Sequence, residues 1–160
     1  MKQPDSEDPW LTVVELRAWV GLIKLSARVV ALTDGELRRH HGITGRDYEL
    51  LHHLSGAAKG QRVSELAEVI DDSSSCITHR VNRLSAAGLV EKRSDPDDQR
   101  ARRIVLTRAG RSLLTNAAPD HARRVRRWII DALDARDLRH LARITERLGE
   151  HLRTVEPILP

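Results

Sequence analysis

The chain has one cysteine, no phenylalanine, and only three tryptophans and one tyrosine. A single cysteine excludes an internal disulfide framework and is typical of a protein in a reducing cytoplasm. Because aromatic residues are scarce, we expect a core of Leu, Val, Ile and Ala, a composition that favours helices. No uncharged apolar run approaches the roughly 20 residues that cross a bilayer, and the polar, acidic start does not resemble a secretory signal. We therefore expect one cytoplasmic domain.

Motifs of the common enzyme and metal-protein classes are also missing from the sequence. We find no Gly-rich phosphate loop, no nucleophile elbow and no H-E-x-x-H. The eight histidines include two adjacent pairs but no pair at i, i+4, so no local metal site is indicated. Cys76 has no second cysteine to pair with, so we predict that it packs and does not sense redox state. We expect neither an enzyme nor a protein with a metal or cofactor.

Positive charge is concentrated in one region of the chain. The whole chain carries a formal charge of +4, and residues 74–111 alone carry +5, with nine Lys and Arg against four Asp and Glu. The remaining residues therefore sum to −1. This local excess predicts a polyanionic partner, with nucleic acid as the first choice.

A helical pattern followed by two β-prone runs fills this basic region. Ile77, Val81 and Leu84 recur at i, i+4 and i+7 and would face a core, which leaves the polar residues between them on other faces. The runs 89–93 and 103–106 predict two strands around a charged tip. A polar-faced helix beside a basic hairpin suits a protein that binds nucleic acid, with the helix in a groove and the hairpin on the backbone or minor groove.

Capping signals predict short helices before this region. Thr44 begins a T-G-R-D capping box that opens a helix through Leu54. Ser64 is a candidate N-cap for a helix over 65–70, and Ser73 is a candidate N-cap for the helix that follows. Two short helices separated by a tight polar turn, the second polar on one face, predict a helix-turn-helix.

Apolar helical segments flank this unit on both sides. Residues 10–32 are apolar on most helical faces, and residues 134–155 show an apolar stripe against a charged face. Asp34 and Gly35 predict a break or kink after the first segment, and Pro119 either kinks its helix or starts a new segment. In so small a chain these surfaces favour burial between two subunits, and the alternative is a monomeric bundle with a central helix.

Four short motifs follow one another: S-E-L-A from Ser64, G-L-V-E-K-R from Gly88, D-P-D-D-Q-R from Asp95, and V-L-T-R-A-G from Val105. Their order and spacing resemble the MarR-type (multiple antibiotic resistance regulator) transcription factors over about residues 44–112, while the flanking helices match in pattern only. The resemblance implies a mainly α fold with a small β-hairpin wing. The implied fold is a winged helix-turn-helix within a six-helix homodimer, whose interface would be made by the first and last helices.

The resemblance also implies a division of the chain and a function. Residues 1–9 would be a flexible tail, residues 10–43 and 112–156 a helical dimerisation region, and residues 44–111 a winged helix-turn-helix DNA-binding lobe. The protein would be a ligand-responsive repressor that binds a pseudo-palindromic operator as a homodimer, with two recognition helices in successive major grooves. The alternative is a helical protein–protein interaction module without specific DNA binding, against which the localised positive charge argues.

The recognition helix and the wing carry the predicted DNA contacts. Hydroxyls and free amides at the helix N-terminus suit phosphates, and Thr78, His79 and Asn82 can donate to or accept from base edges. The resemblance implies that Arg100 enters the minor groove and that Asp98 orients it, while the remaining arginines contact phosphates. The full predicted set is Ser73, Ser74, Ser75, Thr78, His79, Asn82, Arg83, Arg93, Asp98, Arg100, Arg102 and Arg103.

The turn before the recognition helix departs from the family pattern. Asp71 and Asp72 stand where many members have glycine and an apolar residue. Asp tolerates the left-handed backbone geometry of such a turn better than most residues. The two acids would either repel phosphates or pair with a nearby arginine.

The resemblance finally implies a cleft for a small aromatic or anionic effector, between the dimer helices and the DNA-binding lobe. Aromatic rings beside a cation would suit an aromatic carboxylate. Taken singly, each candidate is a core or surface residue as readily as a ligand contact. The candidates are Arg17, Trp19, Tyr48, His52 and Trp128.

Overall fold

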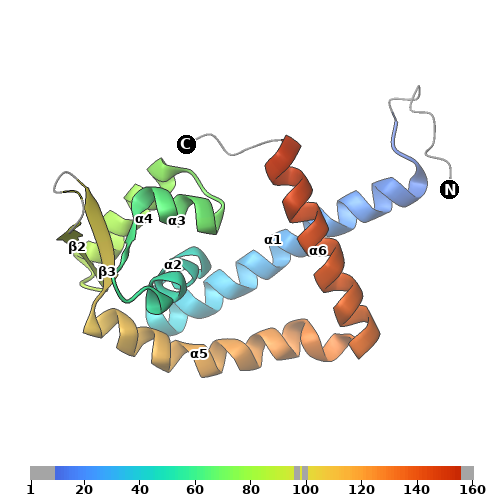
Figure 1. Ribbon diagram of the computed structural model, residues 1–160. Helices are drawn as coiled ribbons and strands as arrows, with labels where there is room; N and C mark the ends of the chain where they lie inside the picture. Colours follow the sequence, from blue (N-terminus) through green and yellow to red (C-terminus); the bar gives the residue numbers. More distant parts are fainter. Residues whose placement is uncertain (1–9, 96–97, 99–100, 156–160) are drawn as a thin grey trace.

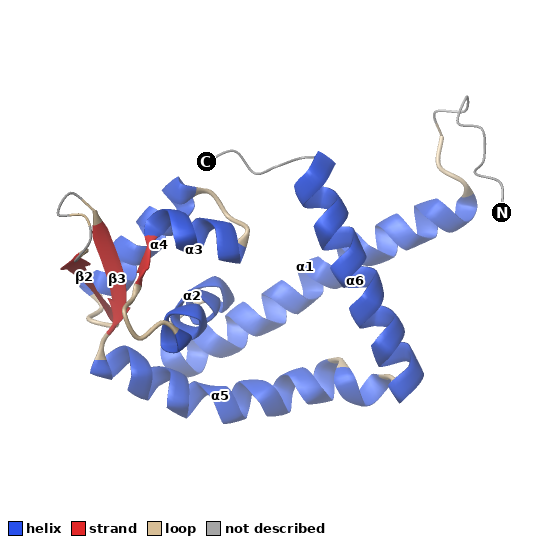
Figure 2. Cartoon of the chain, in the orientation of Figure 1, coloured by secondary structure: helices blue, strands red, loops and turns tan. Residues whose placement is uncertain are grey.

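The computed structural model describes residues 10–95, 98 and 101–155, which form a mainly α-helical fold with one small sheet (Figures 1 and 2). The predicted fold class, a winged helix-turn-helix, is confirmed. The elements are α1 (Val13–His41), α2 (Gly45–Gly56), β1 (Gln61–Arg62), α3 (Val63–Ile70), α4 (Ser74–Ala86), β2 (Val90–Ser94), β3 (Arg102–Leu106), α5 (Arg108–Trp128), the 3-10 turn η1 (Ile130–Ala132) and α6 (Ala135–Val155).

One hydrophobic core lies in the part of the chain around the sheet. Its buried apolar residues run from Leu37, near the end of α1, to Ala117 in α5. The predicted inward face of α4 is confirmed, because Ile77, Val81 and Leu84 are all buried. The N-terminal part of α1 and the whole of α6 contribute no buried residue. In Figure 1, α1 and α5 extend away from the lobe that holds the sheet, and α6 follows at the far end of α5.

Side-chain caps begin α2 and α4 where the sequence predicts them. The capping box of Thr44 and Asp47 is confirmed, with the Thr44 N–H donating to Asp47 Oδ2 at 2.8 Å and the Asp47 N–H to Thr44 Oγ1 at 3.1 Å. Ser73 is the N-cap of α4, as predicted, and Thr107 is the N-cap of α5; hydroxyl side chains are favoured at this position. Each cap satisfies a backbone N–H that the helix itself leaves without a partner.

Two local predictions are wrong, and both errors have a physical reason. Ser64 is not an N-cap, because α3 begins at Val63 directly after the strand β1, and the Glu65 carboxylate accepts the N–H of Arg62 at 2.9 Å. Asp34 does not break α1, which continues to His41. The Asp34 carboxylate accepts the N–H of Gly45 at 2.8 Å and pairs with Arg38 one turn along α1, so it has partners other than the backbone of its own turn.

Pro119 lies inside one long helix. The helix α5 continues through Pro119 to Trp128, so Pro119 does not start a new segment. After Trp128 the chain turns through η1 before α6 begins. No helix of the described residues is long and apolar enough to span a membrane.

The sheet has the strand order β1-β3-β2, and both pairings are antiparallel. The hairpin of β2 and β3 is the predicted wing, with Lys92 opposite Ile104. The strand β1 was not predicted and adds a third strand on the other side of β3. Gly110 packs against this hairpin so closely that a Cβ there would lie 2.2 Å from the carbonyl oxygen of Leu89. Only glycine therefore fits this position of the V-L-T-R-A-G motif.

Candidate DNA-binding interface

The helix α4 presents the polar face that the sequence predicts. Ser75, Thr78, His79 and Asn82 are exposed on the side opposite the buried residues. The Thr78 hydroxyl donates to the carbonyl of Ser74 at 2.8 Å, so its oxygen lone pairs and its methyl group remain for a partner. His79 has no hydrogen bond to any described residue, and its ring is available to base edges.

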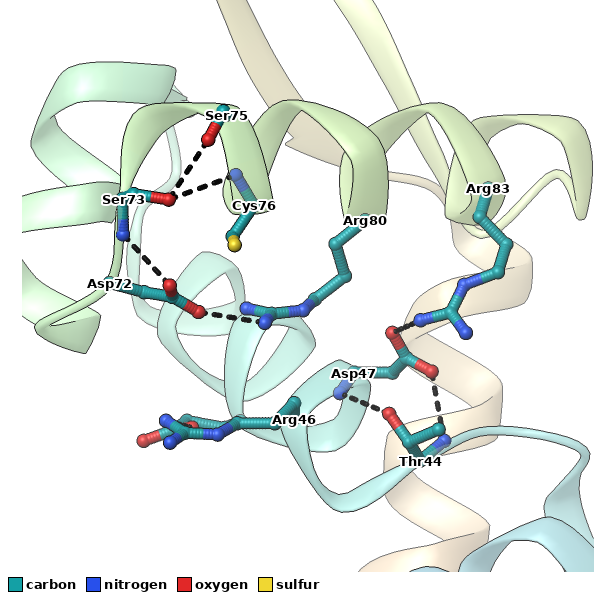
Figure 3. A network of polar contacts seen from close by, with 10 residues as sticks. Thr44, Arg46, Asp47, Asp72, Ser73, Ser75, Cys76, Arg80 and Arg83 are labelled. Carbon is teal, nitrogen blue, oxygen red and sulfur yellow. Dashed lines mark hydrogen bonds and ion pairs between the residues drawn. The ribbon is translucent and has the colours of Figure 1, made fainter. Parts of the chain in front are cut away.

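The N-terminus of α4 is closed by its own side chains. The Ser73 hydroxyl oxygen accepts the N–H of Cys76 at 3.2 Å and lies 3.0 Å from the hydroxyl oxygen of Ser75 (Figure 3). Cys76 is exposed, so the prediction that it packs into the core is wrong. The N–H groups of Ser74 and Ser75, the first two of the helix, have no partner within it, an arrangement that suits phosphate oxygens.

Two arginines on α4 are held by carboxylates from elsewhere in the fold. Figure 3 shows Arg83 turned toward Asp47 of α2 and Arg80 turned back toward Asp72, in the turn before α4. The Arg83 side chain is still 51% exposed, whereas the Arg80 side chain is only 11% exposed. Arg83 can therefore reach a phosphate while paired, and Arg80 cannot without leaving Asp72.

The two acids of the turn have different roles. Asp71 is the one described non-glycine residue with a positive φ, 58°. It ends α3 in the left-handed conformation, which Asp was expected to tolerate at this turn. Asp72 instead accepts the N–H of Ser73 at 2.8 Å and Arg80 Nη2 at 2.9 Å. Burial opposes ionisation of Asp72, but the hydrogen bonds from Arg80 and Ser73 outweigh it and lower the pKa of its carboxyl. Of the two predicted outcomes, the structure shows the ion pair.

In the wing, the structure ties several of the predicted contact residues to neighbours. Arg93 pairs with Glu91, and Arg102 Nη1 donates to Ser94 Oγ at 2.7 Å. Lys92 Nζ donates to Asn82 Oδ1 at 2.7 Å and so connects β2 with α4. The guanidinium groups of Arg93 and Arg102 both lie on exposed side chains, so a phosphate can compete for them.

The tip of the wing is described only in part. Arg100, the predicted minor-groove residue, lies outside the described residues. Asp98, predicted to orient it, is exposed, and its backbone carbonyl accepts the N–H of Ala101 at 2.9 Å. The structure therefore leaves the predicted pairing of these two side chains as a prediction.

A buried carboxylate that the sequence analysis did not single out lies at the base of the wing. The Asp95 side chain is fully buried, and its Oδ2 lies 2.7 Å from Arg62 Nε and 3.0 Å from Arg103 Nε. Hydrogen bonding to Asp95 raises the pKa of Arg62 above its ordinary value. Arg103 also donates to the carbonyl of Gly60 at 3.2 Å. Arg103 was predicted as a phosphate contact, and its guanidinium is engaged inside the lobe.

A cavity of about 510 Å³ lies between α1, α2 and α5. Tyr48 and His52, two of the five predicted effector contacts, line it, whereas Arg17, Trp19 and Trp128 do not. His121 of α5 lines it as well, and its ring centroid lies 4.9 Å from that of Tyr48. Sequence reasoning missed His121, because it is separated from Tyr48 by more than 70 positions and shares no local pattern with it.

His121 gives this cavity a pH-sensitive wall. Burial lowers the pKa of His121, and the Glu36 carboxylate, 3.9 Å from His121 Nδ1, only partly offsets the effect. Because the folded state disfavours the protonated ring, unfolding takes up a proton as the pH falls below about 6.5, the ordinary histidine value. The free energy of unfolding therefore falls as the pH drops below that value, and above it this group has no effect on the pH dependence.

We therefore expect His121→Gln to flatten the pH dependence of stability. Between pH 7.5 and 5.5 the melting temperature of the parent should fall more than that of the variant, because Gln has no proton to take up. His140→Gln, which removes an exposed histidine of α6, is the control and should follow the parent. Equal slopes for the parent and His121→Gln would contradict the assignment.

A second hollow, of about 460 Å³, lies beside α4. Arg38 of α1 and Arg46 of α2 line it together with His79 and Arg83 of α4. Arg38 and Arg46 are both exposed. Among the described residues each pairs with a neighbour on its own helix, Arg38 with Asp34 and Arg46 with Glu49. Sequence reasoning missed them, since they lie outside the locally basic region and come beside α4 only through the fold.

Comparisons with known proteins agree with this geometry. A model described as MarR family matches residues 41–101. AbsC, a MarR family transcriptional regulator from Streptomyces coelicolor, is 32% identical with a TM-score of 0.86, over 92% of this chain and 99% of that one. Sco3205, a MarR family transcriptional regulator from the same organism solved in complex with DNA, is 30% identical with a TM-score of 0.91, over 98% of both chains. A search of curated proteins gave no match.

Proposed function

This chain belongs to the MarR family of transcriptional regulators, and from that premise we propose that it is a ligand-responsive repressor. In this proposal a homodimer binds a pseudo-palindromic operator, and a small aromatic or anionic effector releases it. The observation that carries the proposal is the exposed polar face of α4 beside the basic strands β2 and β3. The DNA complex of the similar regulator Sco3205 supports it.

The proposed division of labour follows the distribution of burial. Residues 44–111 form the DNA-binding lobe, and residues 10–43 and 112–156 form the dimerisation region. Support comes from the large apolar side chains of α1 and α6, which lie exposed on a single chain although such patches on proteins usually mark interfaces. They are Val13, Val14, Leu16, Trp19, Leu22, Ile23, Leu25 and Val30 of α1, joined by Trp10 and Leu11 just before it, and Leu141, Ile144, Leu148, Leu152 and Val155 of α6.

In the proposed complex the two α4 helices of the dimer enter successive major grooves. Thr78, His79 and Asn82 contact base edges, and the hydroxyls of the first turn contact phosphates. Arg83 and the exposed wing arginines neutralise phosphates and release counterions. Arg103 is the exception, because its guanidinium is held by Asp95, and we assign it the support of the wing.

The α1–α2–α5 cavity is the proposed effector site. Tyr48, His52 and His121 supply aromatic and imidazole rings, and Arg46 supplies a cation at the edge. The cavity is lined by the start of α2, whose Asp47 also holds Arg83 of α4. An effector that shifts α2 therefore changes the position of the recognition helix, and a coupling of about 1–3 kcal/mol is typical of such linkage.

The proposal is tested by selecting bound duplexes from a random pool and measuring their affinity by fluorescence anisotropy. We expect His79→Ala to weaken binding of the selected duplex by at least about fivefold, since one base contact contributes about 1–3 kcal/mol. His140→Ala, on α6, should leave it unchanged. Affinity should also fall about a thousandfold or more between 50 and 200 mM salt if six or more phosphates are contacted. An unenriched pool or a flat salt response would refute DNA recognition.

A further inference from the structure

The ion pair of Asp72 and Arg80 gives this protein a feature that its DNA contacts do not explain. Arg80 lies on the recognition helix and lines the hollow beside α4 together with Cys76, His79 and Arg83. Its guanidinium is nevertheless turned back along the helix to Asp72 Oδ2, 2.9 Å away. The two side chains are only 11% and 21% exposed. A cation on the recognition helix is thus kept away from phosphates.

Asp72 also orders the start of the same helix. Its Oδ1 accepts the N–H of Ser73, and the hydroxyl oxygen of Ser73 in turn accepts the N–H of Cys76 in the first turn of α4. One side chain therefore connects the turn, the N-cap and the first turn of α4 with Arg80, two turns further along. Figure 3 shows this carboxylate between the N-cap and the Arg80 guanidinium.

Binding to random DNA and binding to an operator depend on these contacts differently. A mobile arginine adds a phosphate contact to any sequence, because phosphates carry no sequence information. Base contacts require the polar face of α4 to be held in one position. Loss of Asp72 would release Arg80 and loosen the first turn, so random binding would gain while operator binding would gain less or weaken.

Resting on the proposed function, we propose that Asp72 is a specificity-determining residue: it withholds Arg80 from DNA phosphates and fixes the base-reading face of α4. Asp72 does not touch DNA and acts through Arg80 and Ser73, so it is a positioning residue. What it sets is the ratio of operator to random-duplex affinity, which is a difference between two binding free energies.

Asp71 provides a matched control in the same turn. It is exposed and forms no ion pair with any described residue, and asparagine tolerates its φ of 58°. Asp71→Asn and Asp72→Asn therefore remove the same charge from the same place. Only the second releases an arginine.

The experiment measures the affinity of the full-length dimer for the selected duplex and for a random duplex across a salt series. We expect Asp72→Asn to tighten random binding about three- to tenfold, with a salt slope steeper by about 0.9, the value of one added phosphate contact. Operator binding should stay equal or weaken, so the ratio falls about tenfold. Asp71→Asn should change both affinities alike and leave the ratio within about twofold.

A second pair of variants identifies Arg80 as the agent. Asp72→Asn/Arg80→Gln should return the random-duplex salt slope to that of the parent, because the released cation is gone. Arg80→Gln alone should also leave that slope unchanged, and it does not depend on the folding of Asp72→Asn. A lower slope for Arg80→Gln would overturn the inference, since Arg80 would then contact phosphate in the parent. An equal change of ratio in Asp71→Asn and Asp72→Asn would overturn it as well.

Failure of the inference and failure of the proposed function are separate results. If the parent protein does not prefer its selected duplex to random DNA, the proposed function fails. If the parent discriminates and Asp72→Asn keeps the same ratio, the function stands and only the role of Asp72 is rejected.

Discussion

Replacing Ile144 and Leu148 together with glutamate is expected to convert the proposed dimer into a monomer and to abolish the proposed operator recognition. These side chains are 42% and 38% exposed on a single chain and lie one turn apart on the apolar stripe of α6. No residue of α6 belongs to the hydrophobic core, so each lobe should stay folded. The mass in solution should fall from about twice 18.1 kDa to 18.1 kDa. Light scattering after size-exclusion chromatography measures it directly.

Loss of the dimer should weaken operator binding at least about a hundredfold. In a dimer the second lobe is tethered beside the second half-site at a high effective concentration, whereas a separate monomer binds it only at the concentration of free protein. Arg143→Glu places the same side chain on the opposite face of α6 and should remain dimeric. A dimeric mass for the double variant would assign the interface elsewhere. A monomer with full operator affinity would reject the two-lobe mode of binding.

Local patterns predicted the parts of this protein that depend on neighbouring residues. The capping box at Thr44, the cap at Ser73 and the buried spacing of Ile77, Val81 and Leu84 are all confirmed. Each is a relation within one or two helical turns, where geometry is fixed by the helix itself. The family motifs then located the wing. Charge excess pointed to the same region, so the place of the recognition helix and of the basic wing in the chain was predictable.

The polar network behind that surface was not predictable, because its partners are distant in sequence. Asp47 pairs with Arg83 and Asp95 with Arg62, at separations of 36 and 33 residues. In a chain with 27 basic and 23 acidic side chains, many pairings are compatible with the composition, and only the fold selects among them. The strand β1 was missed for a related reason, since two residues carry no period.

The predicted effector contacts depend on tertiary position in the same way. Trp19 and Arg17 were chosen by residue type, but they lie on the part of α1 that extends away from the lobe, and they do not line the cavity. Residue type therefore did not decide which of the candidates share the cavity, because tertiary position decides it. His121 completes the ring cluster from α5, which no pattern around Tyr48 or His52 indicates.

Among single substitutions in the described lobe, Asp95→Asn is expected to cause a large loss of stability. The Asp95 carboxylate is fully buried between Arg62, at the start of α3, and Arg103, on β3. Breaking a buried ion pair costs about 3–5 kcal/mol, because the remaining charges lose their partner in a poorly solvated site. The Arg62 side chain is 35% exposed and can recover some hydration, so we expect about 2–3 kcal/mol.

That loss corresponds to a fall in melting temperature of roughly 5–10 °C for a domain of this size. Glu91→Gln is the matched control on the same sheet, since it removes a carboxylate from the exposed pair with Arg93 and should cost less than about 1 kcal/mol. Chemical denaturation of both variants gives the comparison. Equal midpoints would show that the buried network contributes no more than a surface pair.

A double-mutant cycle with Arg62→Gln separates the network from general damage. If Asp95 and Arg62 stabilise the lobe through each other, the double variant should lose clearly less than the sum of the two single losses. Because the Asp95 carboxylate also lies 3.0 Å from Arg103 Nε on the wing strand β3, its loss should loosen the wing against the rest of the lobe. Asp95→Asn should therefore weaken DNA binding at a temperature where the variant is fully folded. Unchanged affinity there would limit Asp95 to stability.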